Sequence, residues 1–136
     1  MHTTELALRT GSDPVTDLTE RAAAFVAGHG DGLLHVFVPH ATAGLVLIEL
    51  GAGSEPDLLD AVGRLLPRED IYRHRHGSHG HGADHVLPAF LAPSLVVPVL
   101  DGALALGTWQ SIVLVDTNVD NPRRRVRLSL LRDAAA

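Results

Sequence analysis

Histidine is the residue type that limits the chemistry open to this sequence, which contains nine histidines and no cysteine. Without thiols, a transition-metal site has to be built from imidazole and carboxylate groups. Five of the histidines fall within residues 74–85, and neutral imidazole is a common ligand of zinc, copper and nickel. The glycines between them also favour a flexible loop that binds metal only opportunistically, so this segment alone leaves both interpretations open.

Two histidines are expected at positions where the backbone is fixed, and we predict that the chemistry is centred on them. His40 follows a predicted strand and precedes small residues that leave room for a ligand. His85 lies beside Asp84 at the start of a predicted helix. Each could be a metal ligand or a general base in a shared pocket, although His40 could also be a turn residue bonded to a nearby carbonyl.

Other candidate side chains lie near predicted strand ends. The carboxylates of Glu49, Asp116 and Asp120 could bind a metal or carry a proton. The single tryptophan, Trp109, could pack over a substrate or simply belong to the core. Arginines at 123–127 enter the last predicted strand, where a guanidinium could hold a phosphate, although most such runs form solvated faces.

The elements that must position these side chains are mostly extended. Strands are predicted where apolar residues alternate or form short runs, and the Asp-Gly pair at 101–102 predicts a two-residue hairpin. The predicted strands are 4–9, 33–38, 44–50, 95–100, 103–106, 110–115 and 125–131.

Helices are predicted at three places between these strands. The first starts at Asp17 and runs for about three turns. The second starts at Ser54, whose side chain we expect to cap it. A short third helix is predicted over 83–91, although Pro88 falls inside it. The segment 67–84 before it has no apolar periodicity, and long loops in compact domains are often functional.

Length and composition define the broad class of protein. A chain of 136 residues with 46% hydrophobic residues is typical of one globular domain, here 1–136. The net charge of −5 argues against nucleic-acid binding through a broad basic surface. Because no apolar run approaches the ~20 residues that span a bilayer and no signal pattern opens the chain, we expect a cytoplasmic protein with no membrane partner. Nucleotide-binding and hydrolase motifs that would indicate the common enzyme classes do not occur.

Several short motifs, in this order along the chain, resemble the YjbQ-like family from about residue 4 to residue 131. The two most specific are His40-Ala41-Thr42-Ala43 and Gly107-Thr108-Trp109-Gln110, and the others are Tyr72-Arg73-His74, Asp84-His85, Phe90-Leu91-Ala92-Pro93-Ser94 and Pro98-Val99. The resemblance implies an α+β fold: a single domain with two mostly antiparallel β-sheets and two to three helices, assembled as a homotrimer. It also implies a transferase activity, that of a secondary thiamine-phosphate synthase, which joins a pyrimidine pyrophosphate to a thiazole phosphate.

The resemblance carries roles onto particular residues of this chain. The implied catalytic residues are His40, Glu49, His85, Trp109 and Gln110; the implied substrate-binding residues are Thr42, Ser94, Thr108, Arg124 and Arg125; the implied metal ligands are His40, His74 and His85. The metal would be divalent, zinc or magnesium. Many family members have Glu-His-Arg where this sequence has Asp116-Thr117-Asn118, so one histidine ligand is missing, and Asp116, Asp120 or His81 could replace it.

Two hypotheses of different classes follow. The first is a metal-assisted enzyme that acts on a small phosphorylated molecule, and the second is a non-catalytic module that binds a metal or a small anion. The sequence favours the enzyme, because residues fixed near strand ends suit a preorganised site better than a flexible loop does. The small number of nearby carboxylates, however, is a poor match to a site for magnesium and pyrophosphate.

Overall fold

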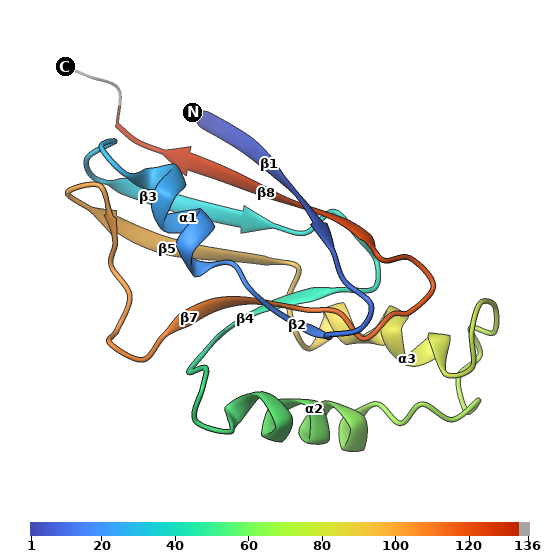
Figure 1. Ribbon diagram of the computed structural model, residues 1–136. Coiled ribbons are helices and arrows are strands. Elements are labelled where there is room, and N and C mark those ends of the chain that lie inside the picture. The colour runs from blue at the N-terminus through green and yellow to red at the C-terminus, as the bar shows by residue number, and fades with distance from the viewer. Residues whose placement is uncertain (134–136) are drawn as a thin grey trace.

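Two antiparallel β-sheets organise the chain (Figure 1), which the computed structural model describes over residues 1–133. The larger sheet has the strand order β1-β8-β3-β5-β6 and the smaller one β2-β7-β4. Their bounds are β1 (His2–Arg9), β2 (Val15–Asp17), β3 (Gly32–Phe37), β4 (Gly44–Ile48), β5 (Ser94–Leu100), β6 (Ala103–Leu104), β7 (Ser111–Val115) and β8 (Arg123–Leu131). The predicted α+β fold with two sheets is confirmed.

Alternation along β8 shows why these segments form strands. Val126 and Leu128 are fully buried, whereas Arg125 and Arg127 face solvent, as the period of two predicts. The same period predicts that Ser129 faces outward with Arg125 and Arg127, but Ser129 is buried and accepts a hydrogen bond from the hydroxyl of Thr3 on β1.

The Asp101-Gly102 hairpin between β5 and β6 is confirmed. Both residues have positive φ, 51° and 73°, which is the conformation that a two-residue turn of this kind requires. Strand β6 itself is only two residues long and is therefore shorter than predicted.

Helix α1 (Thr19–Val26) packs its apolar stripe into the main core. Leu18, Ala22 and Val26 are completely buried together with the inward side chains of the larger sheet. The helix begins two residues later than predicted because Asp17 ends β2, a strand that sequence periodicity missed, and its carboxylate accepts hydrogen bonds from the backbone and hydroxyl of Thr19.

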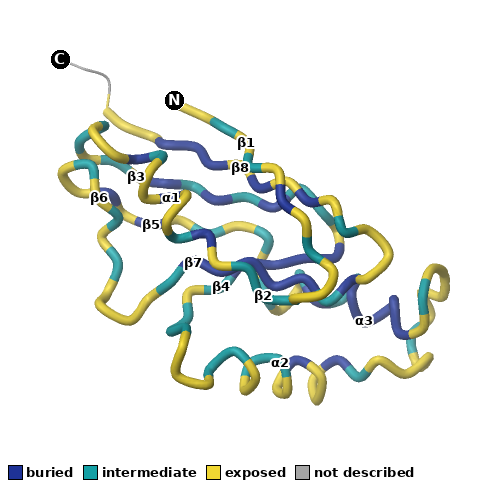
Figure 2. The backbone as a smooth tube through the Cα atoms, in the orientation of Figure 1, coloured by how far each residue is buried: buried dark blue, intermediate teal, exposed yellow. Residues whose placement is uncertain are grey.

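Helix α2 (Ser54–Leu65) runs along the lower side of the molecule in Figure 1 and is exposed over most of its surface (Figure 2). The prediction that Ser54 caps it is wrong. Gly53 is the N-cap residue, with φ of 90°, and no side chain caps the helix. The carboxylate of Glu55 instead accepts a hydrogen bond from the backbone of Gly51 at 2.8 Å.

Helix α3 (His81–Val86) continues into the 3₁₀-helix η1 (Leu87–Ala89). Pro88 is tolerated because it lies in the first turn of η1, where its missing N–H is not needed. Ala83 and Leu87 pack against α2 in a small second core, so this face of α3 is fixed. No helix within residues 1–133 is long and apolar enough to cross a membrane.

Candidate metal centre

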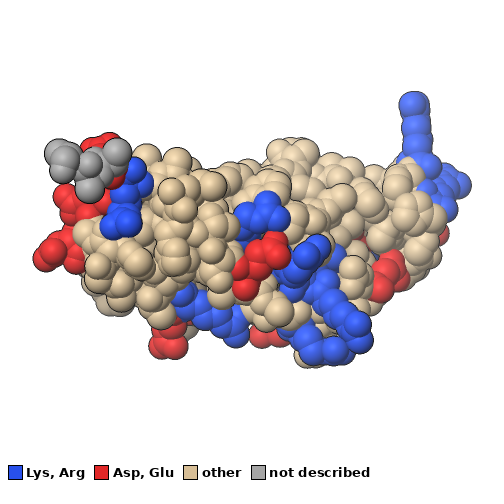
Figure 3. Space-filling view, turned by 90° about the horizontal axis from the view of Figure 1, so that it is seen from above, with Lys and Arg blue, Asp and Glu red and all other residues tan. Residues whose placement is uncertain are grey.

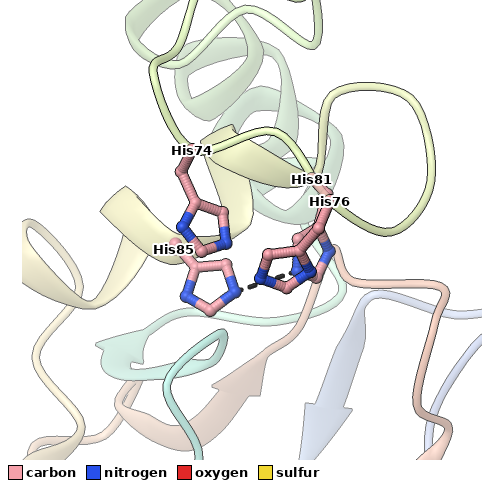
Figure 4. Close-up of side chains that lie close together, drawn as sticks. All are labelled: His74, His76, His81 and His85. Atoms are coloured by element: carbon pink, nitrogen blue, oxygen red, sulfur yellow. Dashed lines mark hydrogen bonds between the residues drawn. The ribbon is translucent and has the colours of Figure 1, made fainter.

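Four imidazoles converge beside α3 (Figure 4). His81 and His85 project from the same face of the helix, one turn apart, and His74 and His76 reach them from the preceding loop. One nitrogen from each ring lies within 4.8 Å of those of the other three, and the Nε2 atoms of His81 and His85 are 2.9 Å apart. This is the one group of three or more potential metal-ligating side chains found within residues 1–133.

The cluster has the size that a tetrahedral metal ion requires. Zinc–nitrogen bonds of about 2.0–2.1 Å place neighbouring ligand nitrogens about 3.3 Å apart, so small side-chain movements would complete the geometry. His81 is buried and His85 half-buried, whereas His74 and His76 are exposed. One side of the centre is therefore fixed by the protein and the other is open to solvent.

The second nitrogen of His81 faces a carboxylate. Nδ1 of His81 is buried and has no well-formed hydrogen bond among the described residues, although Oδ2 of Asp120 is only 2.7 Å away. That oxygen also accepts hydrogen bonds from the backbone and hydroxyl of Ser78, both at 3.1 Å. These bonds and the imidazole of His81 hold the pKa of Asp120 below its ordinary value. A carboxylate beside the outer nitrogen is the usual arrangement for a metal-bound histidine.

Asp84 anchors the helix that carries two of the imidazoles. Its fully buried carboxylate accepts hydrogen bonds from both terminal nitrogens of Arg68, at 2.6 and 3.2 Å, and from the hydroxyl of Thr117 at 2.6 Å. The hydrogen bonds with Asp84 raise the pKa of Arg68. Asp84 therefore joins α3 to the segment after β7 and to the loop before α3, which restricts the positions of His81 and His85.

The environment of the cluster lowers the pKa of two of its imidazoles, those of His85 and His74. Burial lowers the pKa of His85, and the neighbouring rings of His74, His81 and His76 lower it further, against the opposing effect of Asp84. The pKa of His74 is also lowered, by desolvation and by His76 and His81. Only neutral imidazole offers a lone pair to a metal, so this environment favours metal binding.

The glycines of this segment are packed closely rather than spaced as a free linker. A Cβ atom at Gly77 would lie 2.6 Å from Oδ2 of Asp120, and one at Gly82 would lie 2.5 Å from Cβ of Tyr72. Gly77 also has positive φ, 77°. The close approaches favour a defined site over the flexible-loop alternative.

His40 does not belong to this cluster. Its Nε2 accepts a hydrogen bond of 2.9 Å from the backbone N–H of Arg125, which occupies the lone pair of that nitrogen. Burial lowers the pKa of His40, and the nearby guanidinium of Arg124 adds to this effect. The expected pairing of His40 with His85 is thus replaced by a cluster in which His74 and His85 are joined by His76 and His81.

Thr42 and Arg124, both expected to bind substrate, are committed to a buried network instead. The guanidinium of Arg124 pairs with Asp116 at 2.6 Å and donates to the hydroxyl of Thr42 at 2.9 Å. Thr42 also accepts a hydrogen bond from the side chain of Asn118 at 3.0 Å. Of the three replacements considered for the missing histidine, Asp116 therefore lies outside the centre, whereas His81 and Asp120 lie in it or beside it.

The remaining predicted site residues lie elsewhere. Strand register places Gly44 opposite Val115 and Ile48 opposite Ser111, so Glu49 and the segment 107–110 lie at the far end of β4 and β7 from the histidines. Trp109 is 72% exposed and is not a core residue. Ser94 is exposed and its hydroxyl lies 2.6 Å from His35, and Arg125 is exposed on β8. Within this one chain, Glu49, Thr108, Trp109 and Gln110 are not brought to the histidine cluster.

His76 was considered only as part of the histidine-rich segment and was not among the individually predicted metal ligands. Its signal was the His-x-His spacing of residues 74 and 76, directly before Gly77, the glycine that packs against Asp120. His81 was considered only as a replacement ligand, although the spacing of four between His81 and His85 predicts a shared face once both are helical.

Comparisons with known proteins agree with this structure. The family model described as UPF0047 protein YjbQ-like matches residues 4–133. UPF0047 protein Rv2556c of Mycobacterium tuberculosis is 62% identical over 131 residues, covering 96% of this chain and 98% of that protein. A UPF0047 protein of Archaeoglobus fulgidus is 37% identical over 89% of this chain and 94% of its own length.

Solved structures give the same result at lower identity. Hypothetical protein APE1520 of Aeropyrum pernix superimposes with a TM-score of 0.86 at 29% identity, covering 98% of this chain and all of that chain. A YbjQ-like protein of unknown function from Sulfolobus solfataricus, SSO2532, has a TM-score of 0.86 at 25% identity, with 97% of each chain covered. On sequence and fold together, this chain belongs to the YjbQ-like (UPF0047) family.

Proposed function

We propose that the protein binds a divalent transition-metal ion through His74, His76, His81 and His85. The observation that carries this proposal is the convergence of four imidazole nitrogens within 4.8 Å, with His81 and His85 fixed on one face of α3. Ordered contacts from Asp84 and Asp120 hold the helix and the outer nitrogen of His81 in place.

The donor set selects among metals. Imidazole nitrogens suit zinc, copper, nickel and iron, whereas magnesium requires oxygen ligands in octahedral geometry. Zinc therefore fits this centre better than magnesium, the other metal expected from the sequence. With all four imidazoles bound, a tetrahedral ion would have no free position, so it could polarise an oxygen atom of an incoming ligand only by becoming five-coordinate or by releasing an exposed imidazole. His74 and His76 line the open side of the centre, and Asp120 orients His81.

A metal-assisted transferase is the second candidate function, expected from the family resemblance as thiamine-phosphate synthesis. The open face of the centre favours it, because a phosphorylated molecule could reach the imidazoles from solvent. The nitrogen-rich donor set counts against the specific reaction, since a departing pyrophosphate is usually neutralised by magnesium and arginine. The alternative, a non-catalytic metal-binding module, would use the same four histidines but would not act on a substrate.

Metal content and affinity test the proposed centre directly. The protein is stripped with chelator, titrated with zinc by calorimetry, and titrated with cobalt while the visible absorption of tetrahedral cobalt is recorded. We expect one equivalent to bind, and we expect His81→Ala and His85→Ala each to lower affinity at least 10-fold. His79→Ala is the matched control, because His79 is in the same segment but 73% exposed and outside the cluster. Equal affinity in all four proteins would refute the centre.

A separate experiment decides between enzyme and binding module. The wild-type gene and the His85→Ala variant are introduced into a thiamine-requiring strain that lacks its own synthase. Growth that requires His85 supports the transferase, provided that the variant is present at the wild-type level. Absence of growth with a zinc-loaded wild-type protein would favour the binding module.

We also propose assembly as a homotrimer, as the family resemblance implies. The solvent side of the larger sheet carries the exposed apolar side chains of Leu33, Val96 and Leu131, with exposed fractions of 49%, 53% and 47%. A contiguous apolar patch of this kind is unusual on a monomer, and a second copy of the chain would cover it. Light scattering after size exclusion should give three times the 14.4 kDa chain mass, and Val96→Glu should reduce it to the mass of one chain.

A further inference from the structure

A group of arginines stands on the solvent side of β1 and β8, and none of them contributes to the histidine cluster. The register of this antiparallel pair sets Arg9 directly opposite Arg123, and Ala7 opposite Arg125. All four residues are exposed. They line a groove of about 480 Å³. Figure 3, which looks down on the molecule, shows several groups of blue side chains with red ones between them, and the largest blue group lies below and to the right of the centre.

The charge in this groove is not balanced by the protein. Glu5 lies beside Arg127 at 3.0 Å and Arg125 at 3.6 Å, so one carboxylate serves two arginines. Neither Arg9 nor Arg123 forms an ion pair with any residue among 1–133. Arg9 and Arg123 lie directly opposite each other on paired strands, where like charges are destabilising, and a bound anion would offset this repulsion.

The backbone beneath the groove is held rigidly. Arg124 points inward, is only 4% exposed, and is neutralised by Asp116. The hydrogen-bonded ladder continues past the strand end through Thr10, whose N–H donates to the carbonyl of Pro122 at 2.8 Å. Ala7 provides a small floor between the longer side chains. The guanidiniums therefore extend from a fixed platform around a space that no side chain fills.

We propose that Arg9, Arg123 and Arg125 form a site for the phosphate group of a small phosphorylated molecule. Guanidinium groups bind phosphate oxygens in a paired, planar geometry, and two unbalanced arginines match the charge of a phosphate dianion. Nucleic-acid binding usually requires a broad basic surface that contacts several phosphates. This protein has a net charge of −5, and the groove is a single small basic site, so it suits one phosphate group better than a nucleic acid. This inference goes beyond metal binding, because the groove needs no residue of the histidine cluster.

Binding of inorganic pyrophosphate, measured by calorimetry at low ionic strength with chelator present, tests the site without any contribution from metal. We expect saturable binding by the wild type, at least 10-fold weaker binding by Arg9→Gln and by Arg123→Gln, and no detectable binding by the double variant. Arg64→Gln, an exposed arginine on α2, is the matched control and should bind as the wild type does. Affinity should fall steeply as salt is added.

Four results would overturn the proposal. The first is the absence of saturable binding by the wild type, and the second is equal binding by the wild type and the double variant. The third is loss of pyrophosphate binding in His81→Ala, which would place the anion at the metal centre instead. The fourth is a single-stranded oligonucleotide that binds the groove and is not displaced by pyrophosphate, which would assign the arginines to nucleic acid. Failure of the metal titration leaves the expected anion result unchanged.

Discussion

Two polar clusters of this protein, the histidine cluster and the buried network of Thr42, Asp116 and Arg124, differ in how their hydrogen bonds are satisfied. In the network, Arg124 donates to Asp116 and Thr42, and Asp116 also accepts from the hydroxyl of Thr10, so the charges are compensated inside the chain. In the cluster, one nitrogen from each of four imidazoles faces the other three, and among residues 1–133 these nitrogens have no polar partner except one another. Closed networks specify structure, whereas an open one points to a ligand.

Removing one member of the closed network should have the largest effect on stability. Arg124→Met leaves the buried carboxylate of Asp116 without its cation, and breaking a buried ion pair in this way costs about 3–5 kcal/mol. Urea denaturation followed by circular dichroism measures the loss. Arg125→Met, on the exposed side of the same strand, should change stability by less than about 0.5 kcal/mol. Equal losses in the two variants would contradict the contrast between an inward and an outward arginine.

Metal should stabilise the open cluster and leave the closed network unaffected. At a free zinc concentration 100 times Kd, binding to the folded state alone adds about 2.7 kcal/mol to the free energy of unfolding. Thermal denaturation with zinc and with chelator measures this difference. His81→Ala should abolish it, and His79→Ala, outside the cluster, should retain it. An undiminished zinc effect in His81→Ala would show that the metal binds elsewhere.

Much of the fold is predictable from sequence because its elements carry strong local patterns. The alternation in β8 and the Asp101-Gly102 turn each fix an element by local sterics and burial. Strand β2 escapes prediction because three residues are too few to show a period. The N-terminus of α2 is misassigned because Gly53, in a left-handed conformation, takes the position that the Ser54 pattern predicts for serine.

The candidate site is only partly predictable, for two physical reasons. A predicted start of α3 at residue 83 leaves His81 outside the helix, but Gly80 at φ of 75° lets it begin at His81 and puts both histidines on one face. The role of His40 depends on a hydrogen bond to Arg125, 85 residues away in the chain, and no local pattern encodes that contact. The residue types alone therefore predict a site built from histidines, whereas tertiary contacts determine which histidines belong to the cluster.

Close packing around the cluster can be tested with a single methyl group. Gly82→Ala places a Cβ atom 2.5 Å from Cβ of Tyr72, and overpacking of this kind costs about 1–3 kcal/mol. We expect a lower urea midpoint and weaker zinc binding, because the loop that carries His74 must move. Gly63→Ala in α2, where a Cβ atom has no neighbour within 4 Å, should instead stabilise by about 0.5–1 kcal/mol. A neutral result at Gly82 would restore the flexible-loop interpretation.

The smallest expected effect concerns His40, which borders the closed network. Burial and the charge of Arg124 lower the pKa of His40 in the folded state, whereas in the unfolded chain it returns to about 6.5. As the pH falls, the imidazole of His40 is therefore protonated in the unfolded state before it is protonated in the folded state. The contribution of neutral His40 to stability is present above pH 6.5 and is lost progressively below it. His40→Gln can still accept the N–H of Arg125 but does not titrate.

Urea midpoints at pH 7.5 and pH 5 measure this contribution as a difference between proteins. The midpoint of His40→Gln should fall less on acidification than that of the wild type, whereas His79→Gln, on the exposed loop, should follow the wild type. Parallel pH dependence in wild type and His40→Gln would mean that His40 titrates alike in both states. In that case the charge of Arg124 would not affect the imidazole of His40, and His40 would not be coupled to the buried network of Thr42, Asp116 and Arg124.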